Sequence, residues 1–312
     1  MHIGIDMMGG DFAPIETIKG IQLYFSGKKN SANLVLIGNK HTIENLVKEY
    51  NLTIGNFSIV HADQVIDMYE HPAKALKEKP RSSIAIGLQL LASDKIDAFI
   101  SAGNSGAMLV GALYTIKALQ GVIRPAISSI IPKADGGTGL LLDVGLNADC
   151  KPEHLNQFAI MGTVYARLIM GTTDPKTGLI NVGEEEGKGN LLSQATFKLL
   201  KENLHIKFIG NIEGRDILQN KADVMVCEGF TGNIILKMAE SLYEISQKKN
   251  VKDEYFDRFN FEIYGGTPIL GVSKPVIIGH GISTAKAFMN MIQLAQNLIE
   301  KDMMQKMKDE LS

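Results

Sequence analysis

The sequence lacks several features that define whole classes of protein. It contains two cysteines, Cys150 and Cys227, and its formal net charge is only −2 over 312 residues. Two cysteines are too few for a disulfide framework, so we expect a cytoplasmic protein in a reducing compartment. No basic cluster is dense enough for a nucleic-acid groove, so nucleic acid is not expected as a partner.

Long apolar runs are missing as well. No uninterrupted run reaches the ~20 residues that a transmembrane helix needs. The first residues, MHIGIDMMGGDF, show no basic region followed by an apolar one, so we expect no signal peptide. Membrane contact, where it occurs, should therefore be peripheral. The hydrophobic content of 45% is ample for a large core.

The chain is organised around residues 96–110, which read IDAFISAGNSGAMLV. The apolar run at 96–100 indicates a buried strand, and an apolar helical pattern begins at residue 107. Between them, Gly103 and Gly106 let a ligand approach the backbone, and free N–H groups at a helix start suit an anion. Three neutral donors lie in the same turn: Ser101, Asn104 and Ser105. A tight strand-to-helix connection with an Asn or Ser N-cap explains these residues equally well.

Apolar runs and helical patterns alternate along the rest of the chain. The pattern predicts strands at 2–6, 33–37, 57–60, 126–131, 138–144, 179–182, 206–209, 223–227 and 275–278. It predicts helices at 14–23, 42–50, 83–91, 107–119, 153–170, 191–200, from about 234, and at 283–308. Residues 135–137, Asp-Gly-Gly, indicate an antiparallel hairpin. We therefore expect an α/β fold, a three-layer α/β/α Rossmann-like sheet that is mainly parallel, in one domain over residues 1–312. Residues 245–262 should be an irregular insertion, residues 264–272 a loop, and residues 72–83 a solvated helix and loop.

Glycine, aspartate, asparagine and histidine concentrate where the predicted strands end. Ligands of open α/β sheets bind at the carboxyl ends of the strands, so these residues are candidates for a site. The acidic run at 184–186 is not predicted to bind metal, because consecutive residues seldom converge on an ion. The turns also lack a P-loop or a Gly-x-Gly-x-x-Gly fingerprint, so we expect neither a metal nor a nucleotide cofactor.

Seven ordered motifs resemble those of one bacterial family. They are residues 8–14 (MGGDFAP), 101–107 (SAGNSGA), 142–147 (LDVGLN), 181–190 (NVGEEEGKGN), 210–216 (GNIEGRD), 228–233 (EGFTGN) and 264–272 (YGGTPILGV). From about residue 1 to residue 297 the chain is similar to the PlsX family of acyl-carrier-protein:phosphate acyltransferases. The resemblance implies a fold like that of phosphotransacetylases and isocitrate/isopropylmalate dehydrogenases. It also implies acyl transfer from acyl-carrier protein to inorganic phosphate, giving acyl phosphate for phosphatidic acid and phospholipid synthesis.

The resemblance further implies a cytoplasmic homodimer, peripheral at the inner face of the membrane, that can work with the membrane glycerol-3-phosphate acyltransferase PlsY. The implied catalytic donors are Asn233, Lys237, His280 and Lys188. The implied phosphate- or substrate-binding residues are Gly9, Gly10, Asp11, Ser101, Gly103, Asn104, Ser105, Gly106, Asp143, Asn147, Asn211, Gly229, Thr231 and Gly232. Ser105 replaces a usual Thr, Glu228 a usual Asp, and residues 279–282 vary a usual Ala-His-Gly-Ser. The segment between Lys237 and Tyr264 is short for the family, which weakens the expectation of membrane association.

The implied reaction demands little of the protein. Phosphate is itself a nucleophile, and a thiolate of pKa near ~8.5 leaves readily. Positioning and preorganised donors can therefore carry catalysis. Cys227 lies in an apolar run and should be a buried, inert thiol, and Cys150 is not favoured as a nucleophile either. The alternatives are a phosphotransacetylase that uses coenzyme A thioesters and a non-catalytic carrier-protein or membrane scaffold on the same fold.

Overall fold

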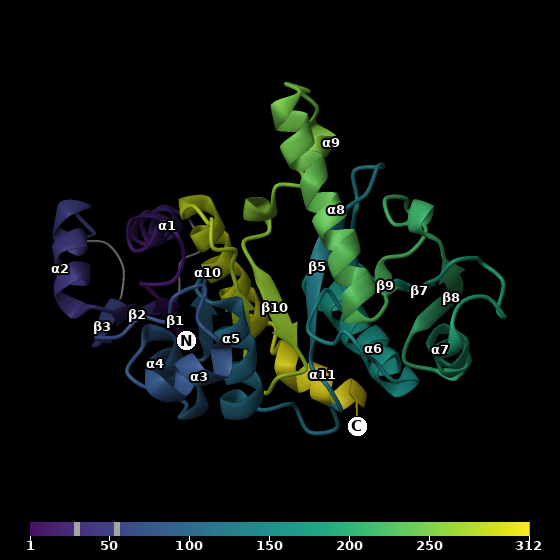
Figure 1. Cartoon of the computed structure of the whole chain (residues 1–312), viewed down its shortest axis with the longest axis horizontal. Helices are drawn as coiled ribbons and strands as arrows, with labels where there is room; N and C mark the ends of the chain where they lie inside the picture. The colour runs from purple at the N-terminus through teal and green to yellow at the C-terminus, as the bar shows by residue number, and fades with distance from the viewer. Residues whose placement is uncertain (28–31, 53–56, 312) are drawn as a thin grey trace. The chain divides into compact units, whose positions relative to one another are not determined.

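The computed structural model describes residues 1–27, 32–52 and 57–311, and its chain forms two compact units (Figure 1). Unit 1 contains Met1–Lys117 and Phe261–Glu300, and unit 2 contains Ala118–Asn260 and Lys301–Ser312. Each unit has its own sheet and its own core. The predicted single domain over residues 1–312 stays a prediction.

Unit 1 is built on a six-stranded sheet. Its strands are β1 (His2–Asp6), β2 (Asn33–Gly38), β3 (Phe57–His61), β4 (Ala98–Ser101), β10 (Thr267–Leu270) and β11 (Val276–Ile278), in the order β3-β2-β1-β4-β11-β10. All neighbouring strands are parallel except β10 and β11. The register pairs Ile5 with Ile100 and Ile278 with Ser101. The carboxyl ends of β1, β4 and β11 therefore lie together at one edge of the sheet.

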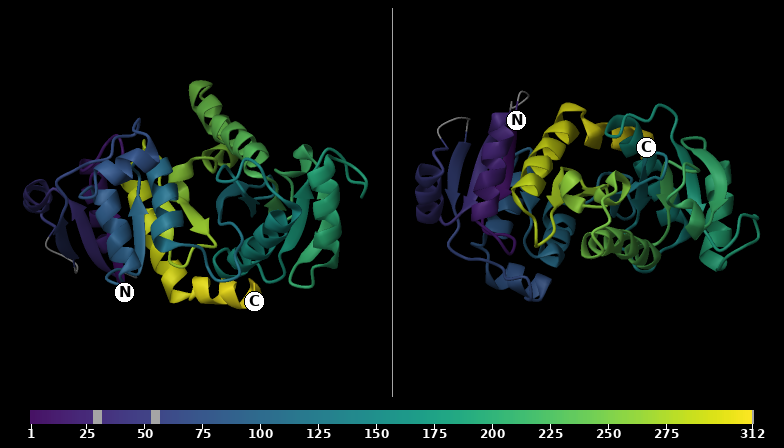
Figure 2. Two further views of the ribbon diagram at one scale, coloured as in Figure 1. Left: turned by 60° about the horizontal axis from the view of Figure 1, so that its bottom comes forward. Right: turned by 90° about the horizontal axis from the view of Figure 1, so that it is seen from above.

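Helices cover both faces of this sheet. One face carries α1 (Ile15–Ser26), α2 (Lys40–Glu49) and α10 (Ala285–Glu300), and the other carries α3 (Pro72–Glu78), α4 (Ser83–Ala92) and α5 (Ser105–Gly111) (Figure 2). The helices pack closely because glycines lie at the contacts. A Cβ on Gly20 of α1 would lie 2.5 Å from Cβ of Phe288 in α10, and one on Gly87 of α4 would lie 2.2 Å from the Phe99 ring of β4.

Unit 2 has a five-stranded sheet in the order β5-β6-β9-β7-β8. Its strands are β5 (Ala126–Pro132), β6 (Thr138–Leu142), β7 (Lys176–Ile180), β8 (Lys207–Ile212) and β9 (Val224–Val226). Its helices are α6 (Pro152–Leu168), α7 (Leu191–Glu202), α8 (Gly229–Lys248), α9 (Glu254–Asp257) and α11 (Met303–Leu311). The predicted hairpin is confirmed, because β5 and β6 pair antiparallel while the other neighbours are parallel.

Alternating side chains in unit 2 face two helical layers. Leu142 and Val224 reach Gly162 of α6, where a Cβ would lie 2.6 Å from Val224. Their neighbours Leu141 and Met225 belong instead to a buried cluster that packs against apolar residues of α8. Successive strand residues point to opposite faces, so each strand contributes to both layers. The predicted mainly parallel α/β sheet with helices on both sides is confirmed.

Some predicted boundaries were wrong. Helix α8 begins at Gly229, not near residue 234, because the Glu228 carboxylate caps it, and it continues to Lys248 inside the predicted irregular segment. Residues 267–270 form β10 within the predicted loop. The predicted long final helix is two helices, which are separated at Asp302 in a left-handed backbone conformation, φ 49°. None of the helices in the described part of the chain is long and apolar enough to cross a membrane.

Candidate functional site

In unit 1, a buried carboxylate organises the edge where the parallel strands end. Asp6, the last residue of β1, is fully buried, and its carboxylate accepts hydrogen bonds from Ser101 Oγ at 2.7 Å and Met8 N at 2.9 Å. Ser83, in the first turn of α4, also hydrogen-bonds to it. Burial raises the pKa of Asp6 above its ordinary value, and these hydrogen bonds oppose that shift. One carboxylate thus joins β1, β4 and the start of α4.

The turns that follow β1, β4 and β11 interlock around this carboxylate. A Cβ on Gly9 would lie 2.4 Å from Asp6 Oδ2 and 2.6 Å from Gly103 N, so only glycine allows this approach. Gly103 N donates to Ser101 Oγ at 2.9 Å. Asp11 N donates to Gly281 O at 2.7 Å, which joins the β1 turn to the loop after β11. Unit 1 therefore brings together these predicted residues: Gly9, Gly10, Asp11, Ser101 and Gly103.

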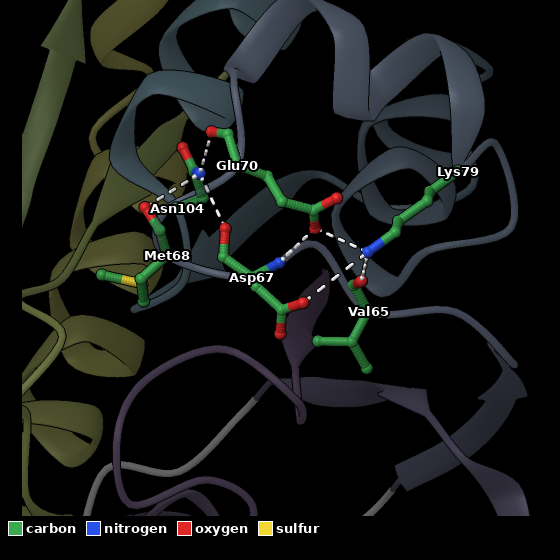
Figure 3. A network of polar contacts seen from close by, with 6 residues as sticks. All are labelled: Val65, Asp67, Met68, Glu70, Lys79 and Asn104. Atoms are coloured by element: carbon green, nitrogen blue, oxygen red, sulfur yellow. Dashed lines mark hydrogen bonds and ion pairs between the residues drawn. The ribbon is translucent and has the colours of Figure 1, made fainter.

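Asn104 holds a neighbouring loop instead of presenting its amide to solvent. Its Nδ2 donates to the carbonyls of Asp67, Met68 and Glu70 at 2.9, 3.3 and 3.0 Å (Figure 3). Its Oδ1 accepts from Ala107 N at 2.9 Å. The residue is 4% exposed. These bonds use its amide fully, so its side chain is a helix cap and a loop anchor.

The same loop is held from its other side by Lys79. Its ammonium donates to Val65 O at 2.7 Å and pairs with Glu70, whose carboxylate also accepts from Asp67 N at 2.7 Å (Figure 3). The prediction of a purely solvated stretch at 72–83 missed this role, because the partners of Lys79 lie earlier in the chain. The loop at 65–70 is thus fixed at both sides.

The other two residues of the predicted phosphate turn differ in their surroundings. Ser105 is exposed at the first position of α5. Gly106 packs against α3, because a Cβ there would lie 2.4 Å from Pro72 Cγ. A larger residue at Gly106 would therefore disturb helix packing whether or not the turn binds an anion. His280, after β11, lies against Phe261 with ring centroids 4.2 Å apart.

Unit 2 has its own buried carboxylate at a strand end. Asp143 follows β6, and its side chain accepts from Ile127 N at 3.1 Å, Leu146 N at 3.2 Å, and both Asn147 N at 2.6 Å and Asn147 Nδ2 at 2.9 Å. Burial raises the pKa of Asp143, and the hydrogen bonds from Asn147 and the backbone oppose the shift. Asn147 Nδ2 also donates to Pro125 O at 2.8 Å, so both predicted residues are bound to backbone.

The first turn of α8 packs directly on this loop. A Cβ on Gly229 would lie 2.8 Å from Asn147 O, and one on Gly232 would lie 1.9 Å from Asp143 O. Asn233 Nδ2 donates to Val144 O at 3.2 Å. Thr231 donates from its N–H and hydroxyl to the Glu228 carboxylate. The N-terminus of α8 therefore already binds one carboxylate, that of Glu228.

The remaining predicted residues of unit 2 lie on three different elements, Lys237 in α8, Asn211 in β8 and Lys188 in the loop between β7 and α7. Lys237 is 55% exposed and pairs with Glu240 at 2.7 Å, and Lys188 is 53% exposed with Glu185 at 4.0 Å. Asn211 is buried, and its Nδ2 donates to Glu185 O at 2.9 Å. In residues 1–27, 32–52 and 57–311, no group of three His, Cys, Asp or Glu side chains is placed to hold a metal ion.

Neither cysteine is prepared to act as a nucleophile. Cys227 is buried, and burial raises the pKa of its thiol well above the ordinary value. Burial, reinforced by the nearby Asp143 charge, raises the pKa of the Cys150 thiol to about 12. A thiol of that pKa is ionised in only about one molecule in 10⁵ at pH 7. Both cysteines therefore remain protonated thiols under physiological conditions.

The chain resembles proteins of one known family along its whole length. The profile of the family described as "Fatty acid synthesis protein" matches residues 1–306. The chain is 41% identical to a phosphate acyltransferase of Dictyoglomus thermophilum over 335 residues, covering 100% of this chain and 98% of that protein. It is 40% identical to a phosphate acyltransferase of Thermoanaerobacterium thermosaccharolyticum, covering 100% of this chain and 97% of that protein.

Two solved structures share its fold. A phosphotransacetylase from Streptococcus pyogenes has a TM-score of 0.66 at 18% identity, covering 96% of this chain and 94% of that one. The EutD phosphotransacetylase from Staphylococcus aureus has a TM-score of 0.62 at 17% identity, with the same coverage. The predicted likeness to the phosphotransacetylase fold is confirmed.

The four hydrogen bonds accepted by Asp143 lead to a prediction about unit 2. Asp143→Ala should lower the free energy of unfolding by at least about 3 kcal/mol, because buried donors lose their acceptor. Asp135→Ala is the control, since Asp135 is exposed and accepts a hydrogen bond from Gly137 N, and its loss should cost about 1 kcal/mol or less. Urea denaturation of both variants measures the difference, and equal losses would show that Asp143 does not organise this loop.

Proposed function

The chain belongs to the fatty acid synthesis protein family, whose curated relatives are phosphate acyltransferases, and we propose that it transfers an acyl group to inorganic phosphate for lipid synthesis. The single observation that carries this proposal is the match to those relatives along the entire chain. The fold, which is shared with two phosphotransacetylases at TM-scores of 0.62 and 0.66, is consistent with this proposal.

The acyl donor is acyl-carrier protein, and the product is acyl phosphate for phosphatidic acid synthesis. The seven motifs support this choice over coenzyme A, which is the donor in the alternative. The enzyme works as a homodimer in the cytoplasm, peripheral to the membrane, where PlsY consumes its product. A non-catalytic scaffold on the same fold would need the buried turn residues but not the exposed Ser105 hydroxyl or the exposed Lys237 ammonium, both of which are present in this chain.

In the reaction, a phosphate oxygen attacks the thioester carbonyl. The carbon–sulfur bond breaks, the thiol leaves with a proton, and acyl phosphate remains. Phosphate binds at the first turn of α5 through the backbone N–H groups of Ser105 and Gly106 and the exposed Ser105 hydroxyl. The first turn of α8 is less suitable, because the Glu228 carboxylate already occupies it and repels a second anion.

Asn233, Lys237, His280 and Lys188 are the proposed donors to the phosphate or to the oxyanion of the tetrahedral intermediate. Lys188 and its partner Glu185 are both exposed, whereas Lys237 is exposed and its partner Glu240 is only 20% exposed. An exposed pair contributes about 0–1 kcal/mol, so Lys188 can leave its partner at little cost.

The activity is tested by incubating the purified protein with acyl-carrier protein thioester and phosphate, and trapping acyl phosphate with hydroxylamine. We expect phosphate-dependent acyl hydroxamate without added metal or nucleotide. If neither the acyl-carrier-protein donor nor the coenzyme A donor gives acyl phosphate, the proposal is rejected. Faster turnover with acetyl-coenzyme A than with a long-chain carrier-protein donor would favour the alternative.

The phosphate position is tested by Ser105→Glu, which places a carboxylate where phosphate is proposed to bind. The KM for phosphate should rise at least about tenfold, because the new carboxylate repels phosphate and competes with it for the same N–H donors. The KM for the thioester should change little. His41→Glu is the control, since His41 is exposed in the first turn of α2, where the same charge should have no effect. An unchanged phosphate KM in Ser105→Glu would move the phosphate to the turn at Gly229–Asn233.

Direct attack by phosphate makes both cysteines dispensable. Cys150→Ala and Cys227→Ala should each keep most of the turnover of the folded enzyme. The rate should level off once phosphate is dianionic, whereas attack by Cys150 would rise about tenfold per pH unit toward a pKa of about 12. A trapped acyl-enzyme, or loss of turnover in a folded variant, would establish the covalent route.

A further inference from the structure

Unit 1 contains a cavity beside its interlocked turns. The cavity is separate from the first turn of α5, where phosphate is proposed to bind. The cavity has a volume of about 550 Å³ and lies where the β1 turn enters α1. Its lining residues are Asp11, Phe12, Ala13, Ile15, Glu16 and Thr284. Its volume is within the ~300–1,000 Å³ typical of small-molecule sites. Phe12 and Ile15 are 49% and 46% exposed, so together they form an apolar surface at the cavity.

The cavity is continuous with the strand-end turns. Asp11 lines the cavity, and its N–H donates to Gly281 O at 2.7 Å. Apolar surface continues beyond that contact, because the terminal methyl of Met68 lies 3.0 Å from the position of a Cβ on Gly281, and Ile282 is 55% exposed. Met68 lies on the side of its loop opposite Lys79 (Figure 3). A ligand in the cavity would therefore have one end near the hydrogen bond that joins the turn after β1 to the loop after β11.

The walls of the cavity are held in place before any ligand binds. Glu16 accepts hydrogen bonds from Ala285 N and Lys19 Nζ, both at 2.8 Å, which joins α1 to the start of α10. Thr284 donates from its N–H and its hydroxyl to Glu262. A preformed cavity loses less conformational entropy on binding than one that must be ordered by its ligand.

The chemistry of the lining selects an uncharged, apolar occupant. The charged groups at the cavity are the carboxylates of Asp11 and Glu16, and the neighbouring ammonium of Lys19 is already bonded to Glu16. The Asp11 carboxylate repels the phosphate groups of phosphopantetheine or coenzyme A, whereas the Glu16 carboxylate is paired with Lys19. The apolar walls at Phe12, Ala13 and Ile15 gain free energy when they exclude water against hydrocarbon.

We propose that this cavity holds the hydrocarbon tail of the acyl group, with its carbonyl end toward Asp11 and Gly281. This assignment rests on the proposed acyl transfer and adds to it the part of unit 1 that recognises chain length. Phe12 and Ile15 are then specificity-determining residues. Polar substrates and short acyl groups gain little from them.

The test fills the cavity with a larger side chain. In Ile15→Trp, the ratio of kcat/KM for a palmitoyl donor to that for a butyryl donor should fall at least about tenfold, equivalent to roughly two methylene groups that can no longer be buried. Leu23→Trp is the matched control, because Leu23 lies in the same helix with the same 46% exposure but does not line the cavity. Its ratio should equal that of the parent, and thermal melts confirm that both variants are folded.

A second measurement separates this proposal from acyl transfer itself. A palmitoyl pantetheine thioester with a photoreactive diazirine at the end of its chain should label a peptide containing Phe12 and Ile15 in the parent. Labelling should fall in Ile15→Trp and persist in Leu23→Trp. If acyl phosphate forms but the donor ratio is unchanged in Ile15→Trp, or if the label maps elsewhere, the cavity assignment is overturned and the activity stands. If no acyl phosphate forms, the labelling pattern alone decides whether the acyl tail lies in the cavity.

Discussion

The carboxylate of a buried aspartate at a strand end is the constraint on which each unit depends. Asp6 in unit 1 and Asp143 in unit 2 accept backbone N–H groups that a tight turn would otherwise leave without partners. Neighbouring glycines then approach within distances that no Cβ would tolerate, as Gly9 does at Asp6. The desolvation of each carboxylate costs free energy, and the hydrogen bonds that it accepts offset that cost.

This arrangement uses many polar side chains for structure before any substrate arrives. Asn104, Asn147 and Asn233 all donate to backbone carbonyls in their own units. The backbone N–H groups at the start of α5, the exposed Ser105 hydroxyl and the exposed lysines are the groups that the proposed reaction would use. Such a division suits a reaction in which phosphate supplies the nucleophile and the protein supplies position. The apolar wall at Phe12 and Ile15 complements these polar groups.

The sequence was most informative where structure is local. The β5–β6 hairpin follows from three turn residues, and the strands follow from apolar runs whose period and length are distinctive. It was least informative where a side chain finds a distant partner. Nothing near Asn104 indicates that its amide binds carbonyls at 67–70, and nothing near Asp11 indicates Gly281. The start of α8 was misplaced because a run of glycines predicts a turn, whereas the Glu228 cap makes the same residues helical. The roles of the predicted site residues stay predictions.

The order in which unit 1 is assembled has a consequence for synthesis on the ribosome. Strand β4 pairs on one side with β1, which is made early, and on the other with β11, which belongs to the segment Phe261–Glu300. All of the unit 2 segment Ala118–Asn260 is translated in between. Throughout that interval the nascent chain carries an apolar strand edge whose N–H and C=O groups await their partner. Unit 1 therefore depends on a late segment for its completion, because the edge of β4 that pairs with β11 cannot be covered until that segment has been made.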